Sequence, residues 1–62
     1  MTREALVERL AEVSHATWML QKSRDQGVPF EEIDPAVTDH DRERAEATVA
    51  ELERLGVLKL EG

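Results

Sequence analysis

Hydrophobic residues recur at three- and four-residue intervals along two stretches of this 62-residue chain, which is the period of a helix with one buried face. The first stretch covers about residues 3–25 and carries two adjacent hydrophobic lines. One line comprises Leu6, Leu10, Val13, Thr17 and Leu20, and the other comprises Val7, Ala11, Ser14 and Trp18. Two such lines predict a helix that packs against more than one neighbour. Thr2 is its expected N-cap, and Gly27 is its expected C-terminal stop.

The second stretch covers about residues 35–55 and predicts another amphipathic helix. We expect Asp34 to cap it and Pro35 to occupy its first position, where no backbone N–H is needed. Thr38 with Asp41 offers an alternative start one turn later. The hydrophobic line of this helix comprises Val37, Ala45, Val49, Leu52 and Leu55, and Gly56 follows as a stop.

The segments outside the two helices carry enough hydrophobic residues to pack against them. Between the helices, Pro29 and Phe30 predict a turn, which Val28, Phe30 and Ile33 should hold against the helices. Residues 57–60 alternate in part between hydrophobic and polar positions, which predicts a short C-terminal strand. That strand could pair with the extended segment around Val28 or with its own copy in a dimer. The expected fold is therefore mainly α, an antiparallel two-helix hairpin with a Pro-Phe connecting turn, in a single domain over residues 1–62.

The small size of the chain sets how much core it can build. A domain of about 60 residues buries only about 60% of the surface that its unfolded chain exposes. The chain has no cysteine, so no disulfide can stabilise it further. We therefore expect a homodimer. The predicted core comprises Leu6, Val7, Leu10, Val13, Trp18, Leu20, Val28, Phe30, Ile33, Val37, Val49, Leu52, Leu55, Val57 and Leu58.

The chain is acidic, with 14 acidic and 8 basic residues, a net charge of −6 and a pI near 4.7. Nucleic-acid binding depends on neutralising phosphates, so this balance disfavours direct nucleic-acid binding. It favours a basic protein partner instead, because opposite charges accelerate association. No hydrophobic run approaches the 18 or so residues that a membrane helix requires, and no secretory signal is evident. We expect a cytoplasmic protein that does not associate with membranes.

Two clusters of residues together point to a family. His15-Ala16-Thr17-Trp18 lies late in the first predicted helix, and Val28-Pro29-Phe30-Glu31-Glu32-Ile33 forms the turn. Asp41-Arg42 follows, and Glu53-Arg54-Leu55-Gly56 comes at the end of the second helix. In this order the chain resembles the ryanodine receptor repeat (RyR) domain, over roughly residues 10–58. It departs from the family pattern at Ala16 and in the short segment Asp25-Gln26-Gly27.

The resemblance implies a hydrogen bond between His15 and Asp41 that links the two helices. The residues also make Asp41 notable, because it lies on the hydrophobic line between Val37 and Ala45, where an unpaired carboxylate would be costly. From the residues alone its candidate partners are His15, Arg42, Arg44 and backbone amides. Trp18 is either a hydrophobic anchor between the helices or one wall of a binding pocket.

No arrangement of residues points to catalysis, to a metal ion or to a cofactor. His15, Asp39, His40 and Asp41 match no metal-ligand spacing, and no phosphate-binding loop or nucleophile motif is present. The resemblance implies a non-catalytic interaction module, and we expect it to bind a protein partner or its own copy. The alternative is a sensor or sequestering module for a nucleotide-like anion held by Arg42, Lys22 or Arg24 beside Trp18. A DNA-associated regulator is a third hypothesis. The candidate binding residues are His15, Trp18, Lys22, Arg24, Phe30, Asp41 and Arg42.

Overall fold

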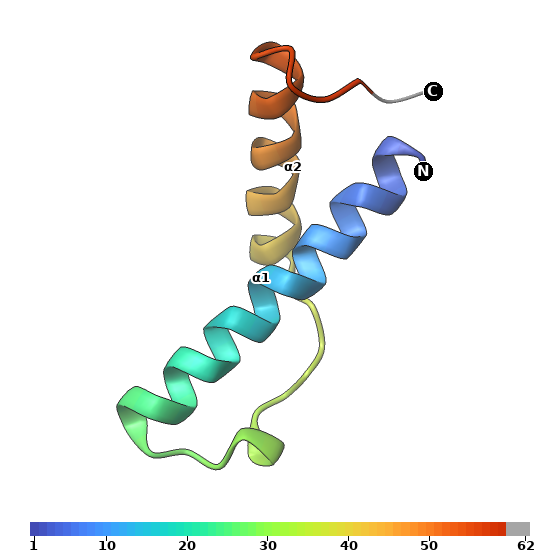
Figure 1. The fold of residues 1–62 in the computed structure, drawn as a ribbon. Coiled ribbons are helices and arrows are strands. Elements are labelled where there is room, and N and C mark those ends of the chain that lie inside the picture. Colours follow the sequence, from blue (N-terminus) through green and yellow to red (C-terminus); the bar gives the residue numbers. More distant parts are fainter. Residues whose placement is uncertain (60–62) are drawn as a thin grey trace.

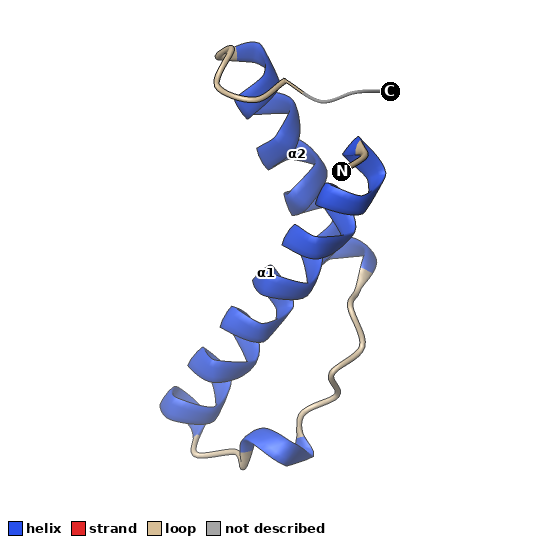
Figure 2. Cartoon of the chain, turned by 45° about the vertical axis from the view of Figure 1, so that its right-hand side comes forward, coloured by secondary structure: helices blue, strands red, loops and turns tan. Residues whose placement is uncertain are grey.

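The computed structural model describes residues 1–59 and consists of two helices joined by a long connector (Figure 1). Helix α1 spans Arg3–Gln26, the short 3-10 helix η1 spans Phe30–Glu32, and helix α2 spans Asp39–Arg54. The helices run in opposite directions and cross, so that α2 packs against the N-terminal half of α1. The C-terminal half of α1 continues past the start of α2, and the connector (residues 27–38) lies beside it (Figure 2). The predicted helical hairpin is therefore present, and its two helices overlap along only part of α1.

The ends of α1 follow the sequence prediction. The Thr2 hydroxyl accepts a hydrogen bond from the backbone N–H of Ala5 at 3.1 Å, which satisfies one of the free amides of the first turn. At the other end Gly27 adopts a left-handed conformation with φ of 67°, which glycine adopts without steric cost.

Helix α2 begins at Asp39, four residues later than the predicted start at Pro35. The N-cap is Thr38, whose side chain accepts from the backbone N–H of Asp41 while the Asp41 carboxylate accepts from the backbone N–H of Thr38. This capping box satisfies two amides at once and sets the start of the helix. The Asp34 carboxylate instead accepts from the N–H of Ala36 in a local turn, so it does not cap the helix.

Helix α2 ends close to the predicted position. The backbone N–H of Gly56 donates to the carbonyl of Glu53 and that of Val57 to the carbonyl of Leu52, with Gly56 at φ of 75°. These two bonds are the Schellman arrangement that closes a helix C-terminus. The predicted strand is not present in residues 57–59, and Leu60 lies outside the described residues. Instead of pairing as a strand, this segment turns back so that Leu58 packs against the core.

The core is a small cluster at the helix crossing, formed by Val7 and Ala11 of α1 with Ala45 and Val49 of α2. Small residues at a crossing let two helix backbones approach closely, which leaves space for few large side chains. The predicted core was therefore too large. Six of its members are exposed, namely Val13, Trp18, Leu20, Phe30, Leu55 and Val57.

A second buried contact holds the connector against α1. Met19 is 6% exposed and Ile33 is 7% exposed, and η1 lies against α1. Met19 was absent from the predicted core, whereas Trp18, for which one interpretation was an anchor between the helices, is 43% exposed. Burial of Met19 and Ile33 confirms that the connector packs against the helix.

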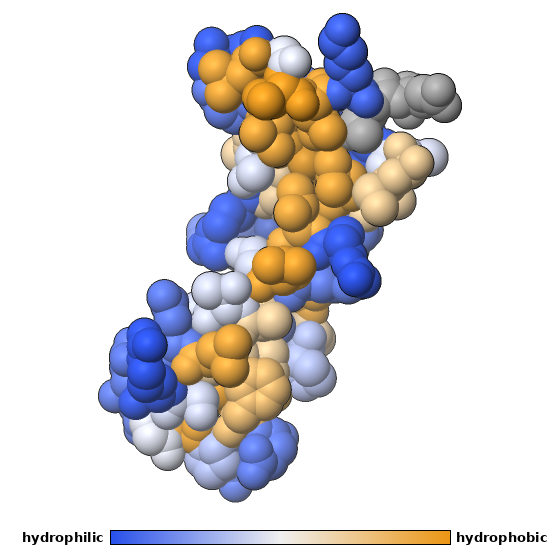
Figure 3. Space-filling view, viewed as in Figure 1, coloured by the Kyte–Doolittle hydropathy of each residue, from blue (hydrophilic) through white to orange (hydrophobic). Residues whose placement is uncertain are grey.

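Hydrophobic atoms reach the surface over much of one face (Figure 3). In this view they extend along α2 and across the crossing, and they reappear over the C-terminal half of α1. Hydrophilic residues flank them on both sides. Within residues 1–59, neither helix combines the length and hydrophobicity needed to cross a membrane.

Candidate functional site

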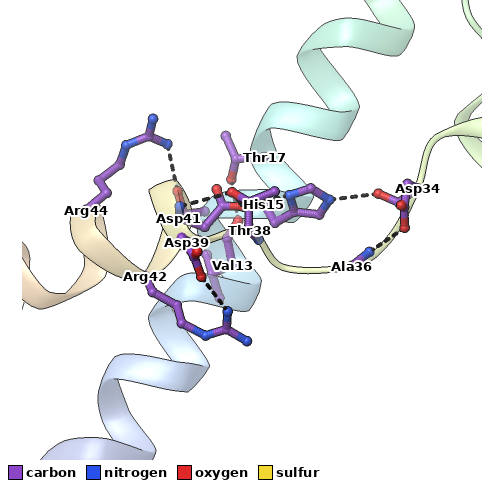
Figure 4. A network of polar contacts seen from close by, with 11 residues as sticks. Val13, His15, Thr17, Asp34, Ala36, Thr38, Asp39, Asp41, Arg42 and Arg44 are labelled. Carbon is purple, nitrogen blue, oxygen red and sulfur yellow. Dashed lines mark hydrogen bonds and ion pairs between the residues drawn. The ribbon is translucent and has the colours of Figure 1, made fainter.

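A buried histidine connects three segments of the fold (Figure 4). His15 lies on α1 and is 4% exposed. Its Nδ1 atom lies 2.8 Å from Oδ2 of Asp41 at the start of α2, and its Nε2 atom lies 2.8 Å from the backbone carbonyl oxygen of Asp34 in the connector. The side chain therefore fixes the connector and α2 relative to α1, as predicted for the His15–Asp41 pair.

The Asp41 carboxylate is buried but has several hydrogen-bond donors around it. Its Oδ2 atom accepts from the backbone N–H of Thr38 at 3.1 Å, from the Thr38 hydroxyl at 2.8 Å and from His15. The Thr38 bonds, followed by the His15 bond, lower the pKa of Asp41 from 3.8 to about 2. Asp41 is therefore ionised throughout the physiological pH range.

The surroundings of His15 indicate its protonation state. A carboxylate and a backbone carbonyl can only accept hydrogen bonds, so both ring nitrogens must donate. The bond to the Asp34 carbonyl, and then the bond and charge of Asp41, raise the pKa of His15 above 6.5 in spite of its burial. Because both nitrogens are engaged within the fold, this histidine has no free basic nitrogen for a substrate.

Beside this network, an open pocket of about 500 Å³ lies between α1, the connector and the start of α2. The α1 wall is formed by His15, Trp18 and Lys22, which share one helix face at intervals of three and four residues. The remaining lining residues are Val28, Glu32, Ile33, Asp34, Ala36 and Thr38 of the connector, and His40, Asp41 and Arg44 of α2.

Trp18 and two cations give this pocket its chemical character. The Trp18 side chain is 43% exposed, and its ring centroid lies 5.4 Å from that of His15. The Lys22 ammonium lies 4.9 Å from the centre of the Trp18 ring, in a cation–π contact. On the α2 side, the Arg44 guanidinium donates to the Ser14 hydroxyl at 2.8 Å, which holds it close to α1. Trp18 is therefore a pocket wall and is not the buried anchor of the other interpretation.

The pocket gathers four of the seven candidate binding residues, namely His15, Trp18, Lys22 and Asp41. Arg24 and Phe30 line a separate groove near the end of α1. Arg42 bonds to Glu8 at 2.9 Å and to Asp39 at 3.4 Å, and it is absent from the pocket lining. An anion beside Trp18 would therefore meet Lys22 and Arg44, whereas Arg42 and Arg24 belong to other surfaces.

Several pocket residues were not among the seven candidates. Arg44 could have been identified, because it follows Asp41 by three residues and so shares the face of α2 that meets α1. The contribution of Asp34 is a backbone carbonyl, and no pattern of side chains can reveal that. His40 neighbours Asp41 in sequence, yet it reaches the pocket only because α2 begins at Asp39.

The described residues contain no group of three or more histidine, cysteine, aspartate or glutamate side chains placed to hold a metal ion. Comparison of the chain with protein family models, with curated proteins and with solved structures finds no match. The resemblance to the RyR domain therefore stays a prediction. The function of the protein has to be inferred from the geometry of the pocket.

Proposed function

We propose that this protein is a non-catalytic interaction module of RyR-domain type that binds a protein partner in the pocket beside Trp18. The observation that carries the proposal is the position of Trp18, a large aromatic side chain left 43% exposed in the wall of a pocket that also contains Val28 and Ile33. Tryptophan in such a position is among the side chains that contribute most to protein–protein binding.

The lining of the pocket suits a polypeptide ligand. Lys22 and Arg44 carry positive charge and Glu32 and Asp34 carry negative charge, so charged groups of both signs share the pocket lining with apolar side chains. Protein interfaces commonly combine apolar and polar side chains. The hydrogen bonds of His15 hold two walls of the pocket in place before a partner binds, which reduces the entropic cost of binding.

The proposal is tested by affinity capture with three immobilised proteins: the wild type, Trp18→Ala and Val57→Ala. Val57 is 71% exposed and is absent from the pocket lining, so it is a matched control for loss of an exposed hydrophobic side chain. We expect a partner that the wild type and Val57→Ala retain and that Trp18→Ala loses. Binding of the purified partner should also change the fluorescence of Trp18, which is the single tryptophan. Equal retention by Trp18→Ala and the wild type would contradict the proposal.

A nucleotide-like anion is a second candidate ligand. It is favoured by the cation–π contact between Lys22 and Trp18, together with the presence of Arg44 in the same pocket. A base could stack near the indole while a phosphate meets the two cations. Titration with a panel of nucleotides, followed by the fluorescence of Trp18, tests this candidate. A response that Arg44→Gln abolishes would support it, and no response across the panel would exclude it.

A further inference from the structure

A second hydrophobic surface lies along α1, away from the Trp18 pocket. This surface, here called the α1 strip, comprises Leu6, Leu10, Val13, Thr17 and Leu20. Successive members are separated by four, three, four and three residues, which is the 3.5-residue period of a coiled-coil seam. Leu6 and Leu10 pack partly against the core cluster, whereas Val13 is 54% exposed and Leu20 is 60% exposed. The part of the strip from Val13 to Leu20 is therefore largely uncovered by the described residues 1–59.

The α1 strip is also nearly free of charge in a strongly charged protein. The helix positions that flank it are Val7, Ser14 and Gln21 on one side and Arg9, Ala16 and Ser23 on the other, so Arg9 is the one charged residue among them. Two copies that each carry a net charge of −6 repel one another. Because the strip is nearly uncharged, this repulsion is weakest when the copies approach through it. Ala16 and the serines are small, which permits close helix contact.

A groove of about 560 Å³ continues the α1 strip at its C-terminal end. Thr17 and Leu20 of the strip line it together with Phe30 of η1 and Arg24. Phe30 is 41% exposed, so the groove presents an aromatic side chain to any helix lying along the strip. The strip therefore continues into the groove, where Leu20 and Phe30 lie beside the polar residues Gln21, Ser23 and Arg24.

We propose that the α1 strip binds the same strip of a second copy of this chain, with the two α1 helices antiparallel. Leu6 and Leu20 are each seven residues from Val13, so in a two-fold symmetric antiparallel pair centred on Val13, Leu6 of one copy lies level with Leu20 of the other. In this arrangement Leu6 of one copy reaches the groove beside Leu20 and Phe30 of the other.

The dimer would also bury additional hydrophobic surface, which the small core of the isolated chain does not provide. The core cluster consists of two valines and two alanines, and the chain has no cysteine. Small domains with so little core are commonly stabilised by oligomerisation. Pairing two hairpins through α1 would produce a four-helix assembly and would bury Val13, Leu20 and Phe30. It leaves the face of α1 that carries Trp18 and Lys22 available, so the dimer is independent of the proposed function.

Sedimentation equilibrium of the full chain tests the dimer. We expect the wild type to sediment at twice the 7.0 kDa mass of one chain at micromolar concentrations. Val13→Glu should raise the dimer dissociation constant at least tenfold, because it places a carboxylate at the centre of the contact. Val57→Glu is the matched control, since Val57 is 71% exposed and off the strip, and it should leave the dimer unchanged. Circular dichroism should show the helical content of the wild type in both variants.

Cysteine cross-linking tests the orientation, because the natural chain has no cysteine. When Leu6→Cys and Leu20→Cys proteins are mixed and oxidised, the antiparallel dimer predicts disulfides mainly between the two different variants. A parallel dimer would give disulfides mainly between identical variants and would overturn the arrangement. A monomeric wild type, or a Val13→Glu protein that dimerises as tightly as the wild type, would overturn the proposal itself.

Discussion

At the residue scale, the fold depends on one polar contact inside an otherwise apolar interface. Asp41 occupies a position on the hydrophobic line of α2 where an apolar residue would ordinarily be expected, and His15 meets it from α1. A buried ion pair contributes little net stability by itself, but loss of one partner leaves the other charge unpaired. The pair therefore specifies the register of the two helices and the position of the connector, more than it adds to stability.

Replacement of Asp41 by alanine should lower the melting temperature by roughly 10 °C. The change removes the carboxylate that accepts from His15 and Thr38, so it leaves the His15 cation unpaired and breaks the capping box. Thermal unfolding followed by circular dichroism measures the effect at one fixed protein concentration. Asp39→Ala is the control, because the Asp39 side chain is 98% exposed, and it should change the melting temperature little. Equal melting temperatures for the two variants would show that the network is dispensable.

The same contact should make stability depend on pH in both directions. The pKa of His15 is raised above 6.5, so its stabilising effect is complete below about pH 6.5 and is lost as the pH rises through the folded-state pKa. The pKa of Asp41 is lowered from 3.8 to about 2, so its effect is complete above about pH 4 and is lost as the pH falls towards 2. Stability should therefore be greatest between about pH 4 and 6.5.

Urea unfolding of the wild type, His15→Gln and His40→Gln between pH 3 and pH 9 checks this prediction. The decline above pH 6.5 should be absent in His15→Gln, because glutamine does not titrate. It should persist in His40→Gln, since His40 is exposed and takes no part in the buried network. If stability fell by the same amount above pH 6.5 in all three proteins, a titratable group other than His15 would be responsible for the decline.

At the scale of the elements, each end of the two helices is closed by local backbone chemistry. Thr2 and Thr38 cap the two N-termini, and Gly27 and Gly56 close the two C-termini in left-handed conformations. Helix α2 starts where the capping box is complete, rather than at the earlier Asp34-Pro35 pair. Residues 35–38 were predicted to be helical but belong to the connector, and Ala36 and Thr38 among them line the pocket.

Replacement of Thr38 by alanine should cost about 1 kcal/mol, which is the usual effect of losing an N-cap side chain. In a chain of this size the melting temperature should fall by roughly 4–8 °C. Thr48→Ala is a suitable control, because Thr48 is exposed within α2 and its hydroxyl donates only to the backbone carbonyl of Arg44. That variant should melt within a few degrees of the wild type. If Thr48→Ala were the more damaging of the two, Thr38 would not be the cap that starts α2.

At the scale of the whole molecule, the protein is an elongated hairpin of 40 × 18 × 16 Å with its core at one place along its length. The helices contact each other at the crossing, while the far half of α1 is bordered by the connector and by the start of α2. That far half carries both proposed binding surfaces, the Trp18 pocket and the C-terminal part of the α1 strip. The Trp18 pocket and the exposed part of the α1 strip therefore lie mainly beyond the core, although the strip begins beside it at Leu6 and Leu10.

Because the core is so small, one core substitution should have a large effect. Val49 is completely buried between the helices, and Val49→Ala should cost about 2 kcal/mol through lost burial and the cavity left behind. Most of the stability of a domain this small could be lost in this way. Val57→Ala, in which the side chain is 71% exposed, should cost less than about 0.5 kcal/mol. Chemical denaturation at a fixed protein concentration measures the free energy of unfolding of both variants. Similar losses of stability in the two variants would show that Val49 is not part of the core.

Much of the local structure of this protein could be predicted from its residues alone. The hydrophobic periodicity predicted both helices, Thr2 and Gly27 marked the ends of the first, and Asp41 stood out as a polar residue on an apolar line. These features depend on residues within one or two helical turns of one another, so a linear pattern can reveal them.

Which hydrophobic residues are buried, and which segments contact each other, could be learned only from the three-dimensional arrangement of the helices and the connector. Helix α2 covers only the first half of α1, so Trp18 and Leu20 stay exposed although their spacing resembles that of core residues. The burial of Met19 depends on the path of the connector through space. So does the hydrogen bond from His15 to the backbone carbonyl of Asp34, 19 residues away. That path is set by long-range packing and by backbone groups that every residue carries, and neither leaves a periodic signal in the sequence.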